Sequence, residues 1–521
     1  MHFQRRTFLK HISLGTLGLC LPRTDAKSLD PVSSSLPRST PEAQGIASKA
    51  ILSFLDAVEE NSFELHSFMM LRHGQVVAEG WWDPYGPEFV HTMYSMSKSF
   101  TSTAVGLAIA EGKLTVEDKV VSFFPDDLPE TISENLAALR VKDLLTMSVG
   151  NEKEPTQPVV KSENWVRTFL AQKLAHKPGT VFMYNSAATY MCSAIVQKVT
   201  GQTILDYLTP RLFTPLGISG MKWESCPRGI NTGGWGLSIQ TEGMAKFGQL
   251  YLQKGQWHGA QILPAAWVEE ATSFHIQQPG DPATGRPDWL QGYGYQFWRC
   301  QHGHYRGDGA FGQFTIVLPE HDAVIVMTSE NKNMQGQLDL VWQHLLSAFH
   351  QPTKSEDGVL ATRLDKLKLT PPAGIAGSPN KKRIDGKVFA LEPNDAGFTS
   401  ASFSFQNDAC LLTLKAAGQS HEITCGLGRW HLGTAAIPDT PPRLISGGKP
   451  VKPVDSKIAA SACWKDESSL SITLRYYETP HHDTLTCKFE GDQVTLSFLS
   501  SLAAMAAKPK DARKSVKGTM V

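Results

Sequence analysis

Ser95-Met96-Ser97-Lys98 stands between an extended segment, Val90-His91-Thr92-Met93, and a run of small and apolar residues at positions 100–110. The run predicts a buried helix, and Gly112 follows it as a typical helix end. Serine and lysine three residues apart lie on the same face of a helix, about one turn from each other. Ser-x-x-Lys occurs five times in the chain, but only this copy opens a long apolar run. The context therefore selects Ser95.

This tetrad carries the groups that a serine nucleophile needs. A serine hydroxyl attacks a carbonyl near neutral pH only when a nearby base takes its proton. Apolar neighbours and other cations lower the pKa of a lysine, which would allow Lys98 to be that base. Backbone N–H groups at the beginning of the helix would point at an oxyanion forming on the substrate. We therefore predict that Ser95 is a nucleophile and Lys98 its base.

Length and composition limit the class of protein. The 521 residues suggest about two to four domains. Lys+Arg and Asp+Glu both number 50, and no basic stripe carries interleaved aromatic residues. Neither nucleic acid nor an anionic membrane is therefore an expected partner.

The first residues predict an export signal over residues 1–26. Gln4-Arg5-Arg6-Thr7-Phe8-Leu9-Lys10 precedes a moderately apolar stretch and resembles a twin-arginine signal. An ordinary secretory signal with a basic start is the alternative. The apolar stretch is too short for a stable membrane anchor. We expect an exported protein, periplasmic or extracellular, with no transmembrane anchor after signal removal; lipidation of Cys20 stays open.

Cysteine and histidine spacing predicts neither a metal site nor a cofactor. The eight cysteines show no paired spacing and no Cys-x-x-Cys. A chain exported already folded would form its structure in a reducing compartment, so we expect small, buried, unpaired cysteines. The nearest candidate for a ligand cluster, His481-His482-Asp483, is interpreted as a solvated turn between two strands.

The order of predicted elements indicates an α+β domain followed by an all-β domain. Strands are predicted near both ends of residues 40–350, with helices between them. This order favours a mostly antiparallel sheet flanked by helices, with an inserted helical lobe. Residues 351–385 are rich in Lys, Pro, Gly and Ser and predict a linker. Short alternating runs over residues 386–500 predict a small β-barrel or sandwich, and residues 501–521 a frayed basic tail.

Residues 40–350 resemble the serine beta-lactamase and penicillin-binding-protein superfamily, closest to its class C beta-lactamase, D-alanyl-peptidase and beta-lactamase-fold esterase branch. Beside the Ser95 tetrad, similar segments follow in the family's order at residues 140–150, 178–186, 233–238 and 307–312. The resemblance implies a beta-lactamase/transpeptidase-like fold. Residues 386–500 resemble the lipocalin-like β-barrel appended to some members.

The family's second motif, usually Tyr-x-Asn, corresponds to Tyr184-Asn185-Ser186. The resemblance implies that Tyr184 helps to move the proton of the nucleophile. Serine stands where asparagine is expected, and Ser186 could still bind Lys98 or the substrate. We expect both Asn185 and Ser186 at the substrate-binding surface.

The third motif departs from the family, which carries Lys-Thr-Gly or His-x-Gly. Alignment on Gly309-Ala310-Phe311-Gly312 places Gly307-Asp308 at its first positions, without a cation. In this register the N–H groups of Ser95 and Ala310 would form the oxyanion hole. A shifted register would offer His304-Tyr305-Arg306 instead.

Three residues around this motif are further candidates for substrate binding. Arg306 could supply the missing positive charge, and Gly309 begins the segment that resembles the family's strand start. Asp308 would repel an acidic group of the substrate. This weakens the case for beta-lactams and D-Ala-D-Ala peptides, which both present a carboxylate.

These features together predict a serine hydrolase that works through an acyl-enzyme on Ser95, without a cofactor. The expected partner is a small-molecule ester or amide, or a cell-wall peptide. A true beta-lactamase or a D,D-peptidase is the alternative enzyme. A penicillin-binding or sensor-like protein with little turnover is the alternative of another class. The natural substrate and the oligomeric state stay open.

The leader allows a direct test of the export route. The double variant Arg5→Lys, Arg6→Lys keeps both positive charges but removes the arginine pair, and we expect it to stay in the cytoplasm. Cell fractionation followed by immunoblotting measures the outcome. Unchanged export of the double variant would instead indicate an ordinary secretory signal.

Overall fold

The computed structural model describes residues 35–521, apart from residues 282, 284, 351–355, 376, 417 and 448–453. The predicted export signal over residues 1–26 lies outside the described part of the chain. None of the helices described there is both long and apolar enough to span a lipid bilayer.

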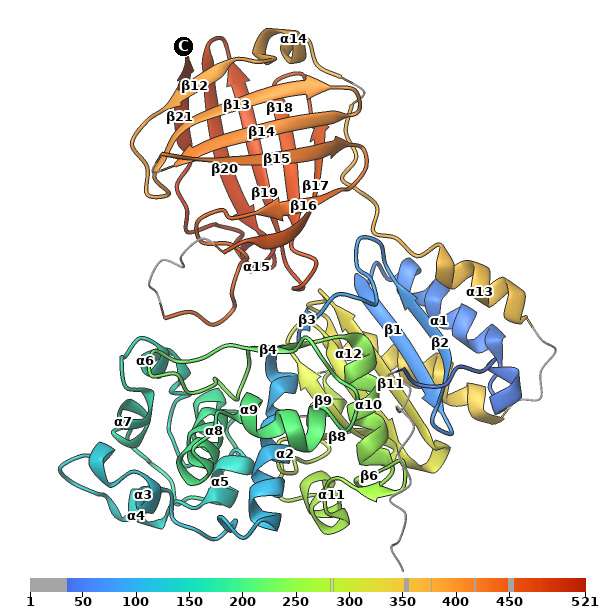
Figure 1. Cartoon of the computed structure of the whole chain (residues 1–521), viewed down its shortest axis with the longest axis vertical. Coiled ribbons are helices and arrows are strands. Elements are labelled where there is room, and N and C mark those ends of the chain that lie inside the picture. Colours follow the sequence, from blue (N-terminus) through green and yellow to red (C-terminus); the bar gives the residue numbers. More distant parts are fainter. Residues whose placement is uncertain are drawn as a thin grey trace, which may run out of the picture. The chain divides into compact units, whose positions relative to one another are not determined.

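One antiparallel sheet is assembled from both ends of the first domain, as the sequence predicts. Its strand order is β2-β1-β11-β10-β9-β8, so that early strand β1 pairs with late strand β11. Figure 1 shows these blue and yellow strands side by side. The strands are β1 (Leu65–Arg72), β2 (Gln75–Trp81), β8 (Trp298–Arg299), β9 (Tyr305–Gly309), β10 (Gln313–Leu318) and β11 (Ala323–Ser329).

Both faces of this sheet are covered by helices, because alternate side chains of each strand point to opposite sides. Phe68 of β1 packs in the core beneath α1 and α12, whereas Met69 packs in the core that includes α2 and α10. These helices are α1 (Ser48–Glu60), α2 (Ser97–Ala110), α10 (Thr241–Leu252) and α12 (Met334–Leu340). The α+β fold class is confirmed.

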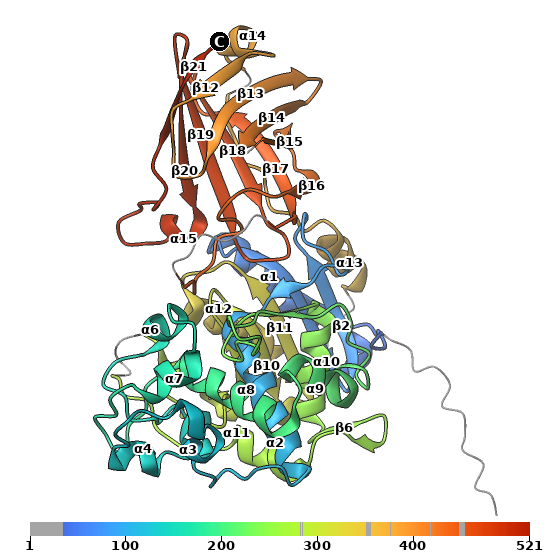
Figure 2. The same cartoon turned by 60° about the vertical axis from the view of Figure 1, so that its left-hand side comes forward.

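Helix α2, which follows the Ser95 tetrad, is the central helix of the domain. All of its residues from Ser97 to Ala108 are buried. At Gly106 an added Cβ would lie 2.4 Å from the ring of Trp267, so only glycine permits this approach of α11 (Ala265–Thr272). Figure 2 shows α2 beside the helices of the inserted lobe.

The predicted helical lobe is present between α2 and α10. Its helices are α3 (Val120–Phe123), α4 (Glu134–Ala138), α5 (Val141–Leu145), α6 (Thr156–Val160), α7 (Trp165–Leu170), α8 (Ser186–Thr200) and α9 (Ile204–Leu208). Short strands lie nearby: β3 (His91–Thr92), β4 (Lys222–Trp223), β5 (Leu237–Ile239), β6 (Gln256–Trp257) and β7 (Ala260–Gln261).

The C-terminal domain is a closed β-barrel. In the part of the chain that is described, nine strands close the barrel through the pairs β12–β21 and β15–β17, and β16 adds to β17. The strands are β12 (Val388–Leu391), β13 (Phe398–Gln406), β14 (Ala409–Ala416), β15 (Gln419–Leu427), β16 (His431–Ala435), β17 (Ser456–Trp464), β18 (Ser469–Arg475), β19 (His482–Glu490), β20 (Gln493–Ser500) and β21 (Val516–Met520).

Two details of the predicted domain boundaries are wrong. Residues 501–521, expected as a frayed tail, contain α15 (Ser501–Ala504) and strand β21, which pairs with both β20 and β12. A barrel removes its free edges only when its terminal strands pair, which explains why the end of the chain is ordered. The predicted linker over residues 351–385 contains α13 (Asp357–Asp365) and α14 (Asn380–Ile384).

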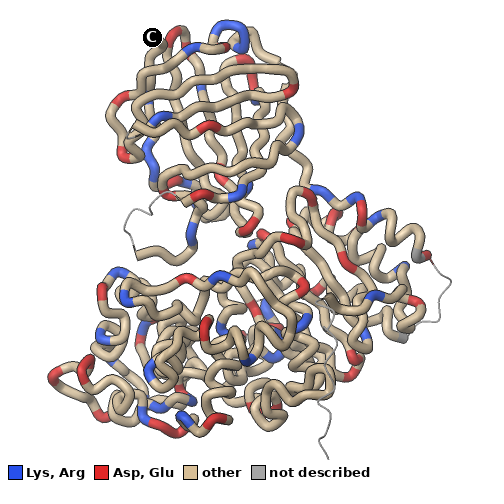
Figure 3. Tube along the Cα trace, in the orientation of Figure 1, with Lys and Arg blue, Asp and Glu red and all other residues tan. Residues whose placement is uncertain are grey.

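The distribution of charged residues and of cysteines in the structure agrees with what the sequence predicts. Figure 3 shows basic and acidic residues interspersed along the traces of both domains. The seven cysteines within the described residues are all unpaired and buried, as predicted.

Candidate active site

Ser95 lies in η2 (Tyr94–Met96), a single 3-10 turn that leads directly into α2. The turn is fixed by Ser97, whose Oγ donates to the carbonyl of Tyr94 (2.6 Å) and accepts from the N–H of Leu237 in β5 (3.1 Å). The second serine of the tetrad therefore holds the backbone around the first. This role was not predicted from the sequence.

Lys98 points from the first turn of α2 into a fully buried position beside Ser95. Its Nζ donates to Ser95 Oγ (3.0 Å), Ser186 Oγ (3.0 Å) and the carbonyl of Gly234 (2.7 Å). Burial lowers the pKa of Lys98 to about 7, although the carboxylates of Glu154 and Asp308 act in the opposite direction. Near neutral pH a large fraction of Lys98 is therefore a neutral amine able to accept a proton.

Tyr184 lies beside Ser95 and Lys98 and completes a three-residue cluster. Its ring centroid lies 4.8 Å from the Nζ of Lys98. Burial raises the pKa of Tyr184 above its ordinary value, and the interaction with Ser95 offsets this only in part. Tyr184 is therefore a phenol near neutral pH, suited to pass a proton on. The structure brings Ser95, Lys98 and Tyr184 together.

The two residues after Tyr184 have different positions. Ser186 accepts a hydrogen bond from Lys98, as one of the two predicted alternatives. Asn185 is buried; its side chain accepts from the N–H of Ala188 (2.9 Å) as the N-cap of α8 and donates to Asn151 (3.0 Å). The prediction that Asn185 contacts substrate is wrong, because asparagine is a common N-cap and both ends of this amide are occupied.

Arg306 does not offer a free charge to a substrate, so that prediction is also wrong. Its guanidinium is fully buried and pairs with Asp308 (Nη2–Oδ2 2.9 Å, Nε–Oδ2 3.0 Å). It also donates to the carbonyl of Asp288 (3.0 Å) and lies over the ring of Trp289. Residues two apart on a strand share a face, which places Arg306 beside Asp308 on β9.

Position 307 faces away from that ion pair. A Cβ added to Gly307 would meet Met96 Cγ and Ser99 Oγ at 3.1 Å, against the beginning of α2. A lysine there would have to displace this packing. The absence of the family's cation is therefore built into the packing of β9 against α2.

Close contact between β9 and the segment before Ser95 brings the two expected oxyanion donors into one region. A Cβ on Gly309 would lie 2.2 Å from the carbonyl oxygen of Met93, so only glycine allows the two backbones to approach. Ala310 follows immediately and opens the turn to β10, in which Phe311 has a φ of 68°. Ala310 follows Gly309 directly, and Ser95 lies two residues after Met93, so both expected donors are close to this backbone contact.

Two pockets lie at the candidate site, one beside Tyr184 and one beside Tyr94. A pocket of about 480 Å³ beside Tyr184 is lined largely by aromatic and apolar side chains, among them Phe182, Trp289, Leu290 and Trp298. Arg286 lies at this pocket, exposed and stacked on Trp289, and no sequence motif indicated it.

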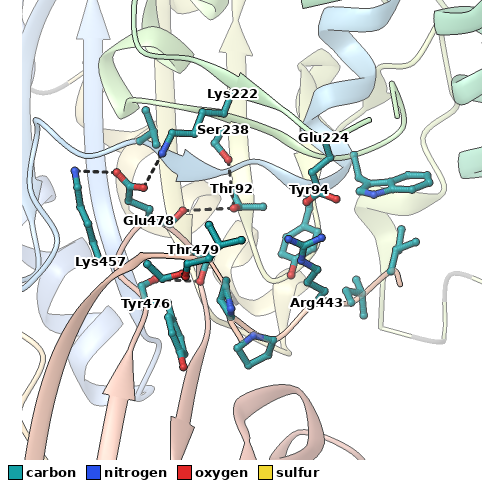
Figure 4. Close-up of a pocket in the computed structure, with 18 of the residues that line it drawn as sticks. Thr92, Tyr94, Lys222, Glu224, Ser238, Arg443, Lys457, Tyr476, Glu478 and Thr479 are labelled. Atoms are coloured by element: carbon teal, nitrogen blue, oxygen red, sulfur yellow. Dashed lines mark hydrogen bonds and ion pairs between the residues drawn. The ribbon is translucent and has the colours of Figure 1, made fainter. Parts of the chain in front are cut away.

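The second pocket is a cleft of about 200 Å³ on the side of Tyr94, lined by both domains. Figure 4 shows Tyr94 between Glu224 of the first domain and Arg443 of the barrel domain. Segments of the C-terminal domain therefore reach the residue that precedes Ser95.

Fold and site define a serine hydrolase of the beta-lactamase/transpeptidase-like superfamily. Residues 58–347 match the family model described as Beta-lactamase, and the chain belongs to this family. It is 25% identical over 335 residues to 6-aminohexanoate-dimer hydrolase of Paenarthrobacter ureafaciens, covering 60% of this chain and 83% of that protein.

Other similarities cover smaller or larger shares of the chain. Protein flp of Staphylococcus aureus strain MW2 is 27% identical over 136 residues, 25% of this chain and 27% of that protein. The octameric penicillin-binding protein homologue from Pyrococcus abyssi is 14% identical, with 90% of this chain and 99% of that chain covered and a TM-score of 0.46.

The pKa of Lys98 leads to a prediction for the pH dependence of acylation. Only the neutral amine can take the proton of Ser95, so the acylation rate should rise with pH and level off above a midpoint near 7. Lys98→Arg keeps a permanent charge and should lower the rate by roughly 10²–10⁴-fold. Stopped-flow acylation between pH 5 and 9 measures both effects.

Lys222 provides the matched control, because it belongs to another Ser-x-x-Lys and its side chain is 66% exposed. Lys222→Arg should leave the rate and its midpoint unchanged. A near-normal rate in Lys98→Arg would show that another group is the base.

Proposed function

We propose that this protein is an exported serine hydrolase that cleaves esters or amides through an acyl-enzyme on Ser95. The observation that carries the proposal is the buried Lys98 amine, 3.0 Å from Ser95 Oγ and with a pKa lowered to about 7. A structural lysine in the interior would be paired with a carboxylate, but this one donates to two hydroxyls and a carbonyl.

The reaction follows from these contacts in two stages. Ser95 Oγ bonds to the carbonyl carbon while its proton passes to Lys98, and the N–H groups of Ser95 and Ala310 stabilise the oxyanion. Collapse of this intermediate breaks the bond to the leaving alcohol or amine, which receives the proton through Tyr184. Water then attacks the carbonyl carbon of the Ser95 ester and gives up a proton to the same groups. The bond to Ser95 Oγ breaks, Ser95 Oγ takes that proton back, and the acid leaves.

The surroundings of the site favour a substrate without a carboxylate near the third motif. Arg306 is neutralised by Asp308, and no other cation lies on β9 among the described residues. The aromatic pocket beside Tyr184 suits an apolar acyl or alkyl group. The name of the relative from Paenarthrobacter ureafaciens describes amide hydrolysis, which supports amides alongside esters.

Two other functions are distinguished by what happens to the acyl-enzyme. A beta-lactamase or D,D-peptidase, which the family name favours, would turn over penicillin or D-Ala-D-Ala peptides rapidly. A penicillin-binding or sensor-like protein would form a stable adduct and release it slowly.

The proposed export to the periplasm or the exterior rests on the Arg5-Arg6 leader.

The nucleophile can be tested directly. Ser95→Ala should abolish fluorophosphonate labelling and hydrolysis of p-nitrophenyl esters, since no other hydroxyl contacts Lys98 and Tyr184 together in the described structure. Ser219→Ala, in another Ser-x-x-Lys, should retain both. Intact-mass spectrometry and melting temperatures compare the variants. Labelling that persists in Ser95→Ala would refute the assignment.

Substrate preference is a separate prediction. A charge-assisted hydrogen bond to a carboxylate contributes about 1.5–3 kcal/mol, so its absence should cost on the order of ten- to a hundredfold in selectivity. We expect a higher kcat/KM for a neutral short-chain ester than for penicillin or a D-Ala-D-Ala peptide. If penicillin is preferred, Arg286 is the group to replace, because its exposed guanidinium lies at the pocket.

A further inference from the structure

His481, at the end of the turn between barrel strands β18 and β19, is buried against the first domain. Its exposed fraction is 0%, so the interpretation of His481-His482-Asp483 as a solvated turn is wrong for this residue. Its Nε2 is hydrogen-bonded to the hydroxyl of Tyr94, and its Nδ1 lies 2.6 Å from Oε1 of Glu330. Both partners belong to the first domain.

His481 also packs against the aromatic rings of two residues that neighbour the expected oxyanion donors. Its ring lies 5.0 Å from that of Phe311 and 5.7 Å from that of Tyr94, and the last two lie 5.6 Å apart. Tyr94 directly precedes Ser95, and Phe311 directly follows Ala310. One barrel residue therefore contacts the neighbours of both N–H donors.

Those two neighbours have a backbone conformation that needs support. Tyr94 has a φ of 47° and Phe311 a φ of 68°, the left-handed region that costs bulky residues about 1–2 kcal/mol each. The torsions of Tyr94 set the direction of the Ser95 N–H, which follows it in the chain. The torsions of Phe311 shape the turn in which the Ala310 N–H lies. Side-chain contacts that hold the rings thus also hold the donors.

The segment after β11 joins the same assembly. Asn331 donates its N–H to the carbonyl of Phe311 (2.9 Å), and its neighbour Glu330 binds His481. Burial alone would raise the pKa of Glu330, but hydrogen bonds from His481 and His482 outweigh it and lower the pKa to about 2. Glu330 is therefore a stable carboxylate that fixes the orientation of the His481 ring.

We propose that His481 of the barrel domain is a positioning residue for the oxyanion hole of the first domain. It holds Tyr94 and Phe311 so that the N–H groups of Ser95 and Ala310 converge on one point. The proposal rests on the proposed acyl-enzyme function, and it gives the barrel domain a part in catalysis without any contact to substrate.

The test uses His481→Ala and Tyr94→Phe in the full-length protein. Loss of a single oxyanion donor lowers kcat by about 10²–10³-fold. Misalignment of two donors in His481→Ala should lower kcat for a neutral ester roughly ten- to a hundredfold, with KM within about twofold. Tyr94→Phe keeps the ring contacts and removes only the hydroxyl, so its loss should be smaller. Rates are normalised to the fraction labelled by fluorophosphonate, which corrects for unfolded protein.

His482→Ala is the matched control, because His482 also binds Glu330 (3.0 Å) but is not in contact with the rings of Tyr94 and Phe311. It should retain kcat. A phenylboronic acid, which forms a tetrahedral adduct with the serine, should bind His481→Ala more weakly, by the same factor as kcat falls. Added imidazole should restore part of the hydrolysis rate of His481→Ala.

The outcomes separate this proposal from the one on which it rests. Normal kcat and boronate affinity in His481→Ala, together with loss of activity in Ser95→Ala, would overturn the positioning role alone. If His481→Ala does not fold, an unchanged kcat in Tyr94→Phe combined with an unchanged kcat in His481→Gln would overturn it. Equal losses in His481→Ala and His482→Ala would show a general effect of Glu330 and also contradict the proposal.

Discussion

The buried amine of Lys98 is the constraint on which the arrangement of the candidate site depends. An unpaired donor or charge in the interior is costly, so its nitrogen needs acceptors. Three separate segments supply them at 2.7–3.0 Å: Ser95 before α2, Ser186 at the start of α8, and the carbonyl of Gly234 before β5. Moving any of these segments would remove a hydrogen-bond partner of the amine. The helical lobe and the central helix are therefore fixed relative to each other by contacts to one amine, whose burial lowers the pKa of Lys98 to about 7.

A second polar cluster lies where the two domains meet. Arg475 of the barrel binds Glu64 (2.6 Å), and Glu330 binds two barrel histidines. Ligand atoms of Glu64, Glu330 and His482 lie within 4.8 Å of one another, a spacing that could hold a metal ion. Arg475 already supplies positive charge there, the two histidines are hydrogen-bonded to Glu330, and the pKa values of both carboxyls are held well below their usual range. The cluster is better explained as a partly buried polar network built on the Arg475–Glu64 ion pair and on hydrogen bonds between Glu330 and the two histidines. These contacts hold the turn between β18 and β19 of the barrel against the first domain.

The sequence predicted those features that depend on local pattern. The Ser95 tetrad before an apolar run gave the nucleophile and the central helix, and the order of strands and helices gave the α+β fold. It could not separate Asn185 as a helix cap from Asn185 as a substrate ligand, because asparagine suits both roles. It also missed His481, whose partner Tyr94 lies 387 residues away in the chain. Strand β21 was missed for a similar reason: its basic, short sequence is ordered only because β12 and β20 offer it two edges.

The ion pair on β9 shows how a family position can change without loss of the fold. Asp308 introduces a carboxylate into a buried site, where alone it would be strongly unfavourable. Arg306 stands two residues earlier, on the same face of the strand, and supplies the opposite charge at 2.9 Å. Each charge of the pair offsets the other in part, so Arg306 does not attract a substrate carboxylate as a free cation would, and Asp308 repels one less than it would alone. Selectivity at this end of the site is therefore expected to come from shape and apolar contact, with Trp289 and Trp298 forming the adjoining wall. Under the proposed function, a member of the Beta-lactamase family would thus retain the serine and lysine while its recognition of an acidic substrate group is reduced.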